Sequence, residues 1–581
     1  MKDKKAVVPA SRALDGVFER NRSGRHENAT AEAGARPAPV RNVRSWLPGT
    51  ALCAGASIVV LAGFSGNASA LEIDLGNPDL RLSWGNTVRY NLGVRTNERS
   101  SAIANSPNTD EGTFRFDKGD VVTNRVDLFT ELDFSYRGAI GFRLSGSAWN
   151  DWAYDSDAKT NPALADRGSY VGNKYSSYTK RFFRGPSGEI LDAYAFWNFQ
   201  AGDMGGNVKV GRHTTLWGEV VALSAHSVSH AQAPLDGLKA LTAPGADAKE
   251  LAMPVGHISG SLQVTPEISL AAQYYYDWDP TRLPEGGTFL GSTDFILQGP
   301  DRFSVAPGVF FINQGIDKPK KDGDYGLSAR WSPSWADGTL GFYYREFDER
   351  SPTLSINPVA RTYRAVYAEN ARLYGLSYST SIAGVSTGFE LVRRERTALN
   401  GTISDGSSNV PRGNTWHALV NGIAVIGPTS VWDQLSLVGE LAYSRWDEVT
   451  SGEQFFNSCS NRPAGDRGAK TGCVTKDATQ IFLRASPQWT AVRPGWDISA
   501  LASVSYGLNG NGSTLGGGNE KAGSYTLGVT ATYNQRHDFT IAYNDYFATH
   551  DVNPATGQIR VSNGSQIQDR GWVVFTYKGS F

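Results

Sequence analysis

The sequence predicts an all-β fold, a transmembrane antiparallel β-barrel of about 18 strands with short periplasmic turns and long extracellular loops. Three observations support this fold class. After residue 70, no apolar run is long enough to cross a bilayer as a helix. Segments of about ten residues alternate between apolar and polar or small side chains, as a barrel wall facing lipid requires. Very short turns between these segments alternate with loops of roughly 15 to 45 residues, the topology of an outer-membrane barrel.

The first segment after residue 70 shows the alternation most clearly. On one face lie Leu82, Trp84, Val88, Tyr90, Leu92 and Val94, interrupted only by Asn86. Polar and small residues occupy the other face. Alternation over this length exceeds the usual strand of about 3–10 residues and favours a tilted membrane strand. The expected strands lie near 80–96, 121–137, 139–154, 188–200, 206–217, 255–264, 267–278, 323–332, 338–348, 371–381, 385–395, 413–426, 433–446, 478–491, 496–508, 522–534, 537–547 and 570–581.

The composition agrees with a β-rich membrane protein. Charged residues make up only 19% of the chain, and there are 64 Gly, 15 Trp, 24 Tyr and 26 Phe. Residues 1–70 contain 10 basic and 5 acidic residues, which leaves 46 basic and 52 acidic residues, a net charge of −6, for the remainder. No basic stripe follows residue 70, so a nucleic-acid partner is not expected.

Residues 1–70 are expected to form an extended N-terminal leader and signal peptide, followed by an outer-membrane β-barrel over residues 71–581. Arg41 and Arg44 precede an apolar stretch over 51–64, and Ala68-Ser69-Ala70 provides a small-x-small cleavage site. An export signal together with a lipid-facing barrel predicts the outer membrane of a Gram-negative bacterium. The expected partners therefore include outer-membrane lipid.

The last strand carries an assembly signal. Val573, Phe575, Tyr577 and the terminal Phe581 share one face. A terminal aromatic residue on an amphipathic final strand is typical of barrels inserted by the outer-membrane barrel-assembly machinery, which makes Phe581 and Tyr577 the candidate residues for that interaction. Barrel geometry makes the segment beginning near Leu80 the partner of this strand.

Two cysteines remain after the leader, Cys459 and Cys473, in a loop rich in Gly, Asn, Asp and Arg. An even number of cysteines in an exported chain predicts a disulfide. Two free thiols or a metal pair are the alternatives, and no histidine lies nearby. His226 and His230 have the spacing of a helical metal pair but no third ligand, so no metal or cofactor is expected.

The stretch from Gly211 to Glu219 resembles the Gly-Arg-Gln-x-x-x-Trp-Gly-Glu element of outer-membrane proteins catalogued as "domain of unknown function 1302". Its matching residues are Gly211, Arg212, Trp217, Gly218 and Glu219, and His213 stands where the family usually has Gln. Pro244-Gly245 provides a further match, whereas the segment near 242 has Thr-Ala where the family often has Arg. The resemblance covers 71–581. It implies a barrel that moves hydrophobic or aromatic small molecules with periplasmic and inner-membrane transport partners, and it brings no catalytic residues.

The loop over 219–254 lacks strand alternation and is only moderately polar. A loop of this length is usually functional or disordered. It is a candidate for folding inward as a constriction, and the alternative is a solvent-exposed outer loop. Alternation turns several charged side chains inward, where they either line a pore or pair with one another in the wall. These candidates are Arg89, Arg125, Asp127, Glu131, Asp133, Arg143 and Arg212.

The sequence thus favours a channel for a small, hydrophobic or aromatic organic solute. One alternative is a substrate-specific diffusion porin for polar or anionic solutes. Others are an outer-membrane docking component of an envelope-spanning export system and a surface receptor. No nucleophile motif with a matching base is present, so an enzyme is not expected.

Overall fold

The computed structural model describes residues 71–320, 322–463, 467–553, 559–560 and 565–581. The predicted leader over 1–70 lies outside them. Eighteen antiparallel strands form a closed barrel, because the last strand pairs with the first. These strands are β2 (Leu80–Arg95), β3 (Val121–Tyr136), β4 (Ile140–Asp151), β5 (Ser187–Ala201), β6 (Met204–His213), β7 (Val255–Gln263), β8 (Ile268–Tyr275), β11 (Tyr325–Trp331), β12 (Thr339–Phe347), β15 (Ala371–Ile382), β16 (Val385–Ala398), β18 (Arg412–Ile426), β19 (Gln434–Ser451), β20 (Asp477–Arg493), β21 (Trp496–Asn509), β22 (Gly523–Tyr533), β23 (His537–Phe547) and β26 (Trp572–Ser580).

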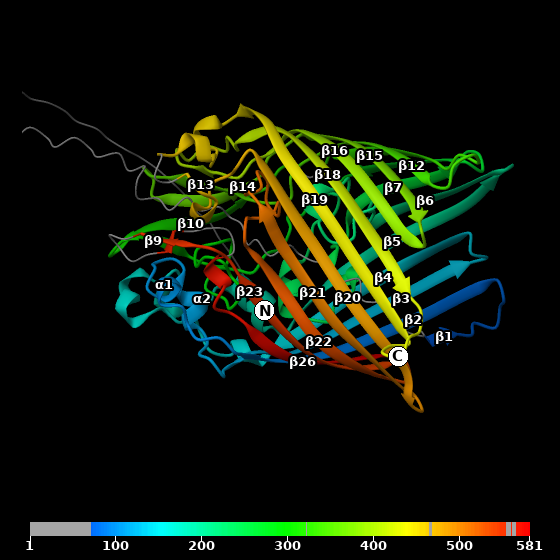
Figure 1. The fold of residues 1–581 in the computed structure, drawn as a ribbon, viewed down its shortest axis with the longest axis horizontal. Coiled ribbons are helices and arrows are strands. Elements are labelled where there is room, and N and C mark those ends of the chain that lie inside the picture. Colours follow the sequence, from blue (N-terminus) through cyan, green and yellow to red (C-terminus); the bar gives the residue numbers. More distant parts are fainter. Residues whose placement is uncertain (1–70, 321, 464–466, 554–558, 561–564) are drawn as a thin grey trace, which may run out of the picture. The chain divides into compact units, whose positions relative to one another are not determined.

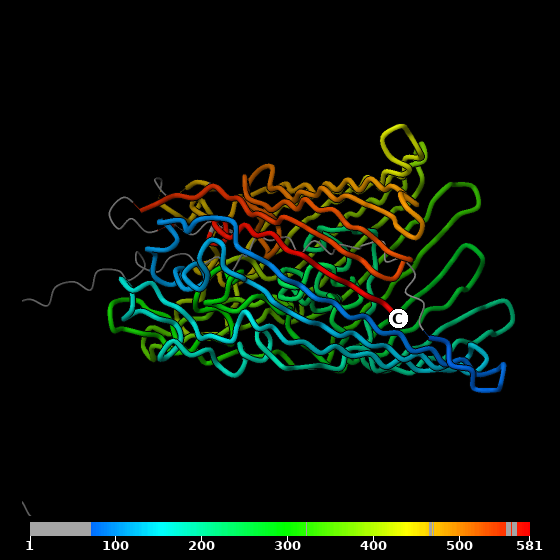
Figure 2. The backbone as a smooth tube through the Cα atoms, turned by 90° about the horizontal axis from the view of Figure 1, so that it is seen from below, coloured from blue at the N-terminus to red at the C-terminus, as the bar shows by residue number. Residues whose placement is uncertain are grey.

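The prediction of an 18-stranded barrel is confirmed, and each expected strand has its counterpart within a few residues. Figure 1 shows the strands tilted side by side, with the long loops at one end and the C-terminus at the end with the short turns. The backbone trace in Figure 2 shows these short turns at the same end of the barrel. Short turns at one end and long loops at the other are the outer-membrane arrangement.

The outer face of the barrel is apolar. On β4, for example, Ile140, Phe142 and Leu144 are exposed, whereas Ser145 and Ser147 are buried inside. Lipid leaves unpaired backbone groups no partner, and a closed ladder of strands satisfies them all. None of the helices in the described residues is long and apolar enough to cross a membrane. The architecture is that of an outer-membrane barrel.

The closing strands join as predicted. Tyr577 on β26 lies opposite Tyr90 on β2. Beyond the last residue of the strand, the Phe581 N–H donates to the Asn86 carbonyl (2.9 Å), and the Asn86 N–H donates to the Phe581 carbonyl (2.8 Å). The terminal residue therefore extends the seam, and its side chain remains exposed.

The long loops contain structure that the alternation did not predict. A five-stranded sheet has the order β17 (Thr402–Ile403), β13 (Thr353–Asn357), β14 (Thr362–Val366), β10 (Val309–Asp317) and β9 (Arg302–Ala306). It packs around buried Phe303, Leu354 and Tyr363. Its strands come from three different loops, so no local sequence pattern predicts the sheet. The remaining strands and α-helices of the described residues are β1 (Leu71–Ile73), β24 (Asp551–Val552), β25 (Ile559–Arg560), α1 (Ser101–Ala104), α2 (Asp110–Phe114), α3 (Ser177–Thr179), α4 (Gly237–Thr242) and α5 (Ala248–Leu251), and short 3-10 or π turns lie between them.

The predicted disulfide is present between Cys459 and Cys473, whose Cα atoms lie 4.9 Å apart. It closes part of the loop between β19 and β20, at the end of the barrel that carries the long loops.

Candidate functional site

The chain enters the barrel interior soon after β6, at Trp217-Gly218-Glu219. Gly218 has φ +93°, which glycine adopts without the strain of a side chain. A Cβ at this position would meet the carboxylate of Glu390 on β16. The Glu219 N–H donates to that same carboxylate, and the Trp217 N–H donates to Gln232 Oε1 (2.9 Å). Glycine at position 218 thus allows the backbone to approach the wall closely.

Two buried carboxylates of the wall hold the backbone that follows. Glu390 also accepts the Val228 N–H (2.7 Å). Glu440 on β19 accepts three consecutive N–H groups, those of residues 221–223. A carboxyl group offers two oxygen atoms, so one side chain can accept several N–H groups at once. These carboxylates therefore fix the loop backbone at two points of the barrel wall.

Two buried guanidinium groups hold the carbonyl groups of the same segment. Arg345 on β12 donates to the carbonyls of Val228 (3.0 Å) and His230 (2.7 Å). Arg394 on β16 donates to the Ala225 carbonyl (3.1 Å). Backbone groups buried away from water must find such partners, because an unsatisfied group costs about 1–3 kcal/mol. The segment over 221–230 is irregular, yet the wall satisfies much of its polar backbone.

The far end of the loop is held on the strands that close the barrel. Arg89 on β2 forms a two-point ion pair with Glu250, with both N–O distances 2.9 Å, and donates to the Gly245 carbonyl (3.1 Å). Both ion-pair side chains are 1% exposed. Lys578 on β26 pairs with Asp247 (2.6 Å). Since β16 and β19 hold one end and β2 and β26 the other, residues 219–254 lie across the barrel interior.

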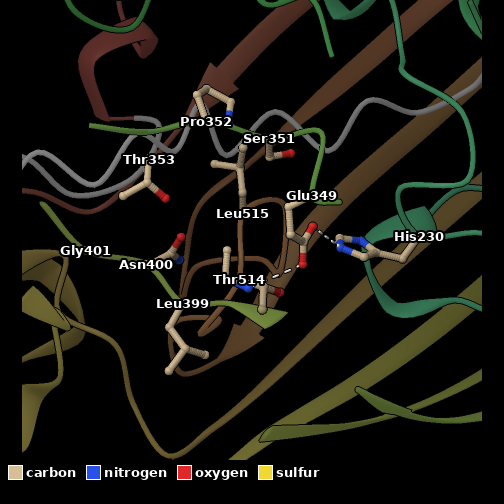
Figure 3. Close-up of a pocket in the computed structure, with 11 residues that line it drawn as sticks. His230, Glu349, Ser351, Pro352, Thr353, Leu399, Asn400, Gly401, Thr514 and Leu515 are labelled. Atoms are coloured by element: carbon tan, nitrogen blue, oxygen red, sulfur yellow. Dashed lines mark hydrogen bonds and ion pairs between the residues drawn. The ribbon is translucent and has the colours of Figure 1, made fainter. Parts of the chain in front are cut away.

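The loop, together with residues of three outer loops, lines an apolar cavity of about 220 Å³. Of the twenty residues that line it, thirteen are aliphatic. Polar groups gather at His230, Arg350 and a few hydroxyl side chains. A second, smaller cavity of about 20 Å³ shares His230, Ser351 and Leu515 with the first, and it contains Glu349 (Figure 3). The aliphatic lining residues are Leu216, Val220, Val221, Ala222, Leu223, Ala225, Ala231, Ala233, Leu235, Ala248, Ala252, Leu283 and Leu515.

A family model described as "Protein of unknown function (DUF1302)" matches residues 51–581. The chain belongs to this family. The resemblance drawn from the Gly211–Glu219 motif is thereby confirmed. No curated protein matches the chain.

Solved structures of outer-membrane channels resemble the chain only distantly. Pseudomonas aeruginosa OpdK with vanillate is 9% identical, at a TM-score of 0.37 over 86% of this chain and 98% of that one. A BenF-like porin from Pseudomonas fluorescens Pf-5 is 8% identical, at a TM-score of 0.38 over 87% and 98%. The outer-membrane channel DcaP of Acinetobacter baumannii is 10% identical, at a TM-score of 0.34 over 86% and 97%. Likeness at this level says nothing about the solute of this DUF1302 chain.

The DUF1302 motif residues flank the interior loop. Gly211 and Arg212 lie near the end of β6, and Trp217, Gly218 and Glu219 begin the loop. Pro244-Gly245 lies near its far end. Gly245 has φ +82°, and a Cβ there would come within 3.2 Å of Thr576 Cγ2 on β26. The motif thus coincides with the points where the loop backbone approaches the wall.

Most of the predicted pore-lining residues face the interior, and each of these is paired with a side chain of opposite charge. Arg125 pairs with Asp127 (2.8 Å) on the same face of β3, and both side chains are buried. Arg143 pairs with Asp133 (2.6 Å) across β3 and β4. Glu131 pairs with Lys249 and Arg89 with Glu250, both partners coming from the interior loop.

Arg212 does not join this group, and the inward orientation predicted for it is wrong. It lies opposite Gly256 of β7 in the register that pairs Val210 with Ile258, and those two side chains are exposed on the outer face. Its guanidinium reaches the Pro254 carbonyl (3.1 Å) and approaches Asp277 (3.8 Å). A long side chain at a strand end can extend its charge out of the apolar band in this way.

Sequence reasoning missed several interior residues of the barrel wall. His213 and His257 stack with ring centroids 3.6 Å apart, Tyr275 stacks on His257, and the Tyr194 ring lies tilted against His213. Glu390, Glu440, Arg345 and Arg394 were also missed. The available signal was a charged residue at an inward position of an apolar strand, as for Glu390 between Phe389 and Leu391.

Proposed function

We propose that this barrel is an outer-membrane channel for small, hydrophobic or aromatic organic solutes, in which residues 219–254 form the constriction. The observation that carries the proposal is the apolar cavity of about 220 Å³ that the loop lines together with residues of three outer loops. A barrel of 16–18 strands otherwise leaves an aqueous lumen. An aliphatic surface in that position favours molecules that leave water readily, because burying apolar area contributes about 25 cal/mol per Å².

The charge pattern supports this function over a porin for anionic solutes. An anion channel would need unpaired cations along the wall. Here Arg89, Arg125 and Arg143 are each bound to a carboxylate. We further propose that solute movement involves periplasmic and inner-membrane transport partners, as the family resemblance implies. The role is transport, not catalysis.

Solute uptake by cells tests the proposal. A strain from which the gene has been deleted would be complemented with the wild-type protein, with Ala225→Phe or with Ala195→Phe. The amount of barrel in the outer membrane would be measured in each strain. Ala225 lines the cavity, whereas Ala195 lies opposite Val210 on the outer face. We expect Ala225→Phe to lower naphthalene uptake at least severalfold, and Ala195→Phe to leave it unchanged.

Arabinose uptake in the same strains separates the alternatives. A channel for apolar solutes should carry little arabinose in any strain. Equal losses of naphthalene and arabinose uptake in Ala225→Phe would indicate a polar porin. Naphthalene uptake that does not depend on the protein would refute the proposal.

A further inference from the structure

His230 and Glu349 form a polar pair where the two interior cavities meet. His230 lines both cavities, and Glu349 lines the smaller one. The His230 Nε2 atom lies 2.9 Å from a Glu349 carboxylate oxygen, with side chains 10% and 3% exposed. Figure 3 shows the two side chains joined by this contact. The pair therefore places a buried polar group beside an aliphatic surface.

The surroundings determine which nitrogen of His230 carries hydrogen. Burial, reinforced by the Arg394 charge, lowers the pKa of His230, so the ring is neutral at pH 7. Burial opposes ionisation of Glu349, but its contact with His230, the Arg394 charge and the Thr397 hydroxyl together lower its pKa. An ionised carboxylate only accepts hydrogen bonds. Nε2 must then be the donor, and Nδ1 carries the lone pair.

The Nδ1 atom of His230 is available to a ligand. Among the described residues it has no hydrogen-bond partner, and the atom is not fully buried. The cation that lines the larger cavity, Arg350, is already engaged. It donates to the carbonyls of Ala231 and Asp279 (both 2.9 Å) and lies 3.5 Å from Asp324.

These groups favour one class of ligand over its close analogues. A carboxylate would meet the negative charge of Glu349 and find Arg350 occupied. A pure hydrocarbon would leave the Nδ1 lone pair unsatisfied. A hydroxyl group can donate to Nδ1 while the rest of the molecule contacts the aliphatic lining.

We infer that the cavity binds a neutral, apolar molecule bearing a hydroxyl group, such as an alcohol or a phenol, and that His230 Nδ1 accepts the hydrogen bond from that hydroxyl. This inference rests on the proposed function and specifies its solute class. His230 is a specificity-determining residue in this arrangement, and Glu349 is a positioning residue that fixes its tautomer. A single hydrogen bond of this kind is worth about 0.5–1.5 kcal/mol, or roughly a two- to tenfold change in affinity.

Three probes with the same body and different head groups test the inference. The full barrel in lipid nanodiscs would be titrated with 4-(trifluoromethyl)phenol, trifluoromethylbenzene and 4-(trifluoromethyl)benzoate, and binding followed by ¹⁹F NMR. Each affinity is corrected for partitioning into empty nanodiscs. We expect the corrected affinity to be highest for the phenol and lowest for the benzoate.

Two variants and one matched control assign the preference to the pair. His230→Phe should remove the two- to tenfold advantage of the phenol and leave trifluoromethylbenzene binding unchanged. Glu349→Gln should raise benzoate binding, because the negative charge is gone. His257→Phe changes another buried interior histidine, one that lines neither cavity, and should keep the phenol preference.

The outcomes distinguish this inference from the function on which it rests. Binding of trifluoromethylbenzene with no advantage for the phenol would overturn the inference and leave the apolar channel standing. A phenol preference that survives in His230→Phe would also overturn it, as would tightest binding of the benzoate. Failure of all three probes to bind the wild-type barrel would overturn both.

Discussion

The ion pair between Arg89 and Glu250 offers the most direct test of how the interior loop is held. Burial alone would raise the pKa of Glu250, yet the adjacent Arg89 charge, with its hydrogen bonds, lowers it to about 2. The carboxylate is therefore ionised at neutral pH. Glu250→Gln keeps the shape of the side chain but leaves the guanidinium of Arg89 buried without a counterion.

The expected magnitude follows from the burial of the pair. Both side chains are 1% exposed, so solvent cannot compensate for the lost charge. Removing one partner of a buried pair costs about 3–5 kcal/mol. Because each 1.4 kcal/mol changes an equilibrium about tenfold, the detached state of the loop should become at least about 100 times more populated.

Conductance of single barrels in planar bilayers measures this change. We expect Glu250→Gln to give larger and more frequently fluctuating currents than the wild type, because the loop leaves the lumen part of the time. Asp133→Asn is the matched control. It breaks another interior ion pair, with Arg143, whose side chains are about one-third exposed and which does not hold the loop. Wild-type currents in Glu250→Gln, or equal changes in both variants, would refute the reasoning.

Four other predictions concern single features of the fold. Gly218→Ala places a side chain at φ +93°, where strain costs about 1–3 kcal/mol; we expect higher leak conductance, and an unchanged leak would contradict it. Burial raises the pKa of Asp294 to about 6, so its contribution to loop stability is present below about pH 4 and is lost as the pH rises through 6. Proteolysis of the outer loops should therefore become faster between pH 5 and 7.5, and this change should be smaller in Asp294→Asn. Faster cleavage at acid pH would contradict the expected direction of the stability change. Replacing Cys459 and Cys473 by serine should lower the stability of their loop by about 3 kcal/mol, seen as faster protease nicking there, and an unchanged nicking rate would argue against it. Deleting Phe581 should reduce the amount of heat-modifiable, folded barrel in the outer membrane without changing the conductance of the barrels that assemble; normal folded levels would refute an assembly role.

The barrel could be predicted from the sequence because its wall obeys a local rule. Lipid contacts every second residue of each strand, so Leu82, Trp84 and Val88 identify a strand without reference to anything distant. The same rule was misapplied at Arg212. Val210 is exposed on β6 and Val208 lies opposite the exposed Trp197, so the strand's own alternation places Arg212 outward as well. A long arginine side chain at a strand end can extend its charge out of the apolar band.

The contacts of the interior loop could not be predicted in this way. Glu390 is 171 residues from Glu219, whose N–H it accepts, and Glu440 is 219 residues from Val221. No periodicity links such positions, because the loop is irregular and its partners lie on different strands. The sheet in the outer loops escaped prediction for the same reason, since its strands join only after the barrel has brought three loops together.

The charged wall and the apolar cavity are two consequences of one arrangement. An irregular segment inside a barrel exposes backbone N–H and C=O groups that need partners, and a sheet or helix is not available to supply them. Here the wall supplies them, with Glu390 and Glu440 accepting from the N–H groups and Arg345 and Arg394 donating to the carbonyls. Fewer of the loop side chains are then needed to satisfy its backbone, and those that line the cavity can be aliphatic. Charges in the wall therefore do not oppose an apolar solute. By binding the loop's backbone, they permit the loop to present an aliphatic surface to the cavity.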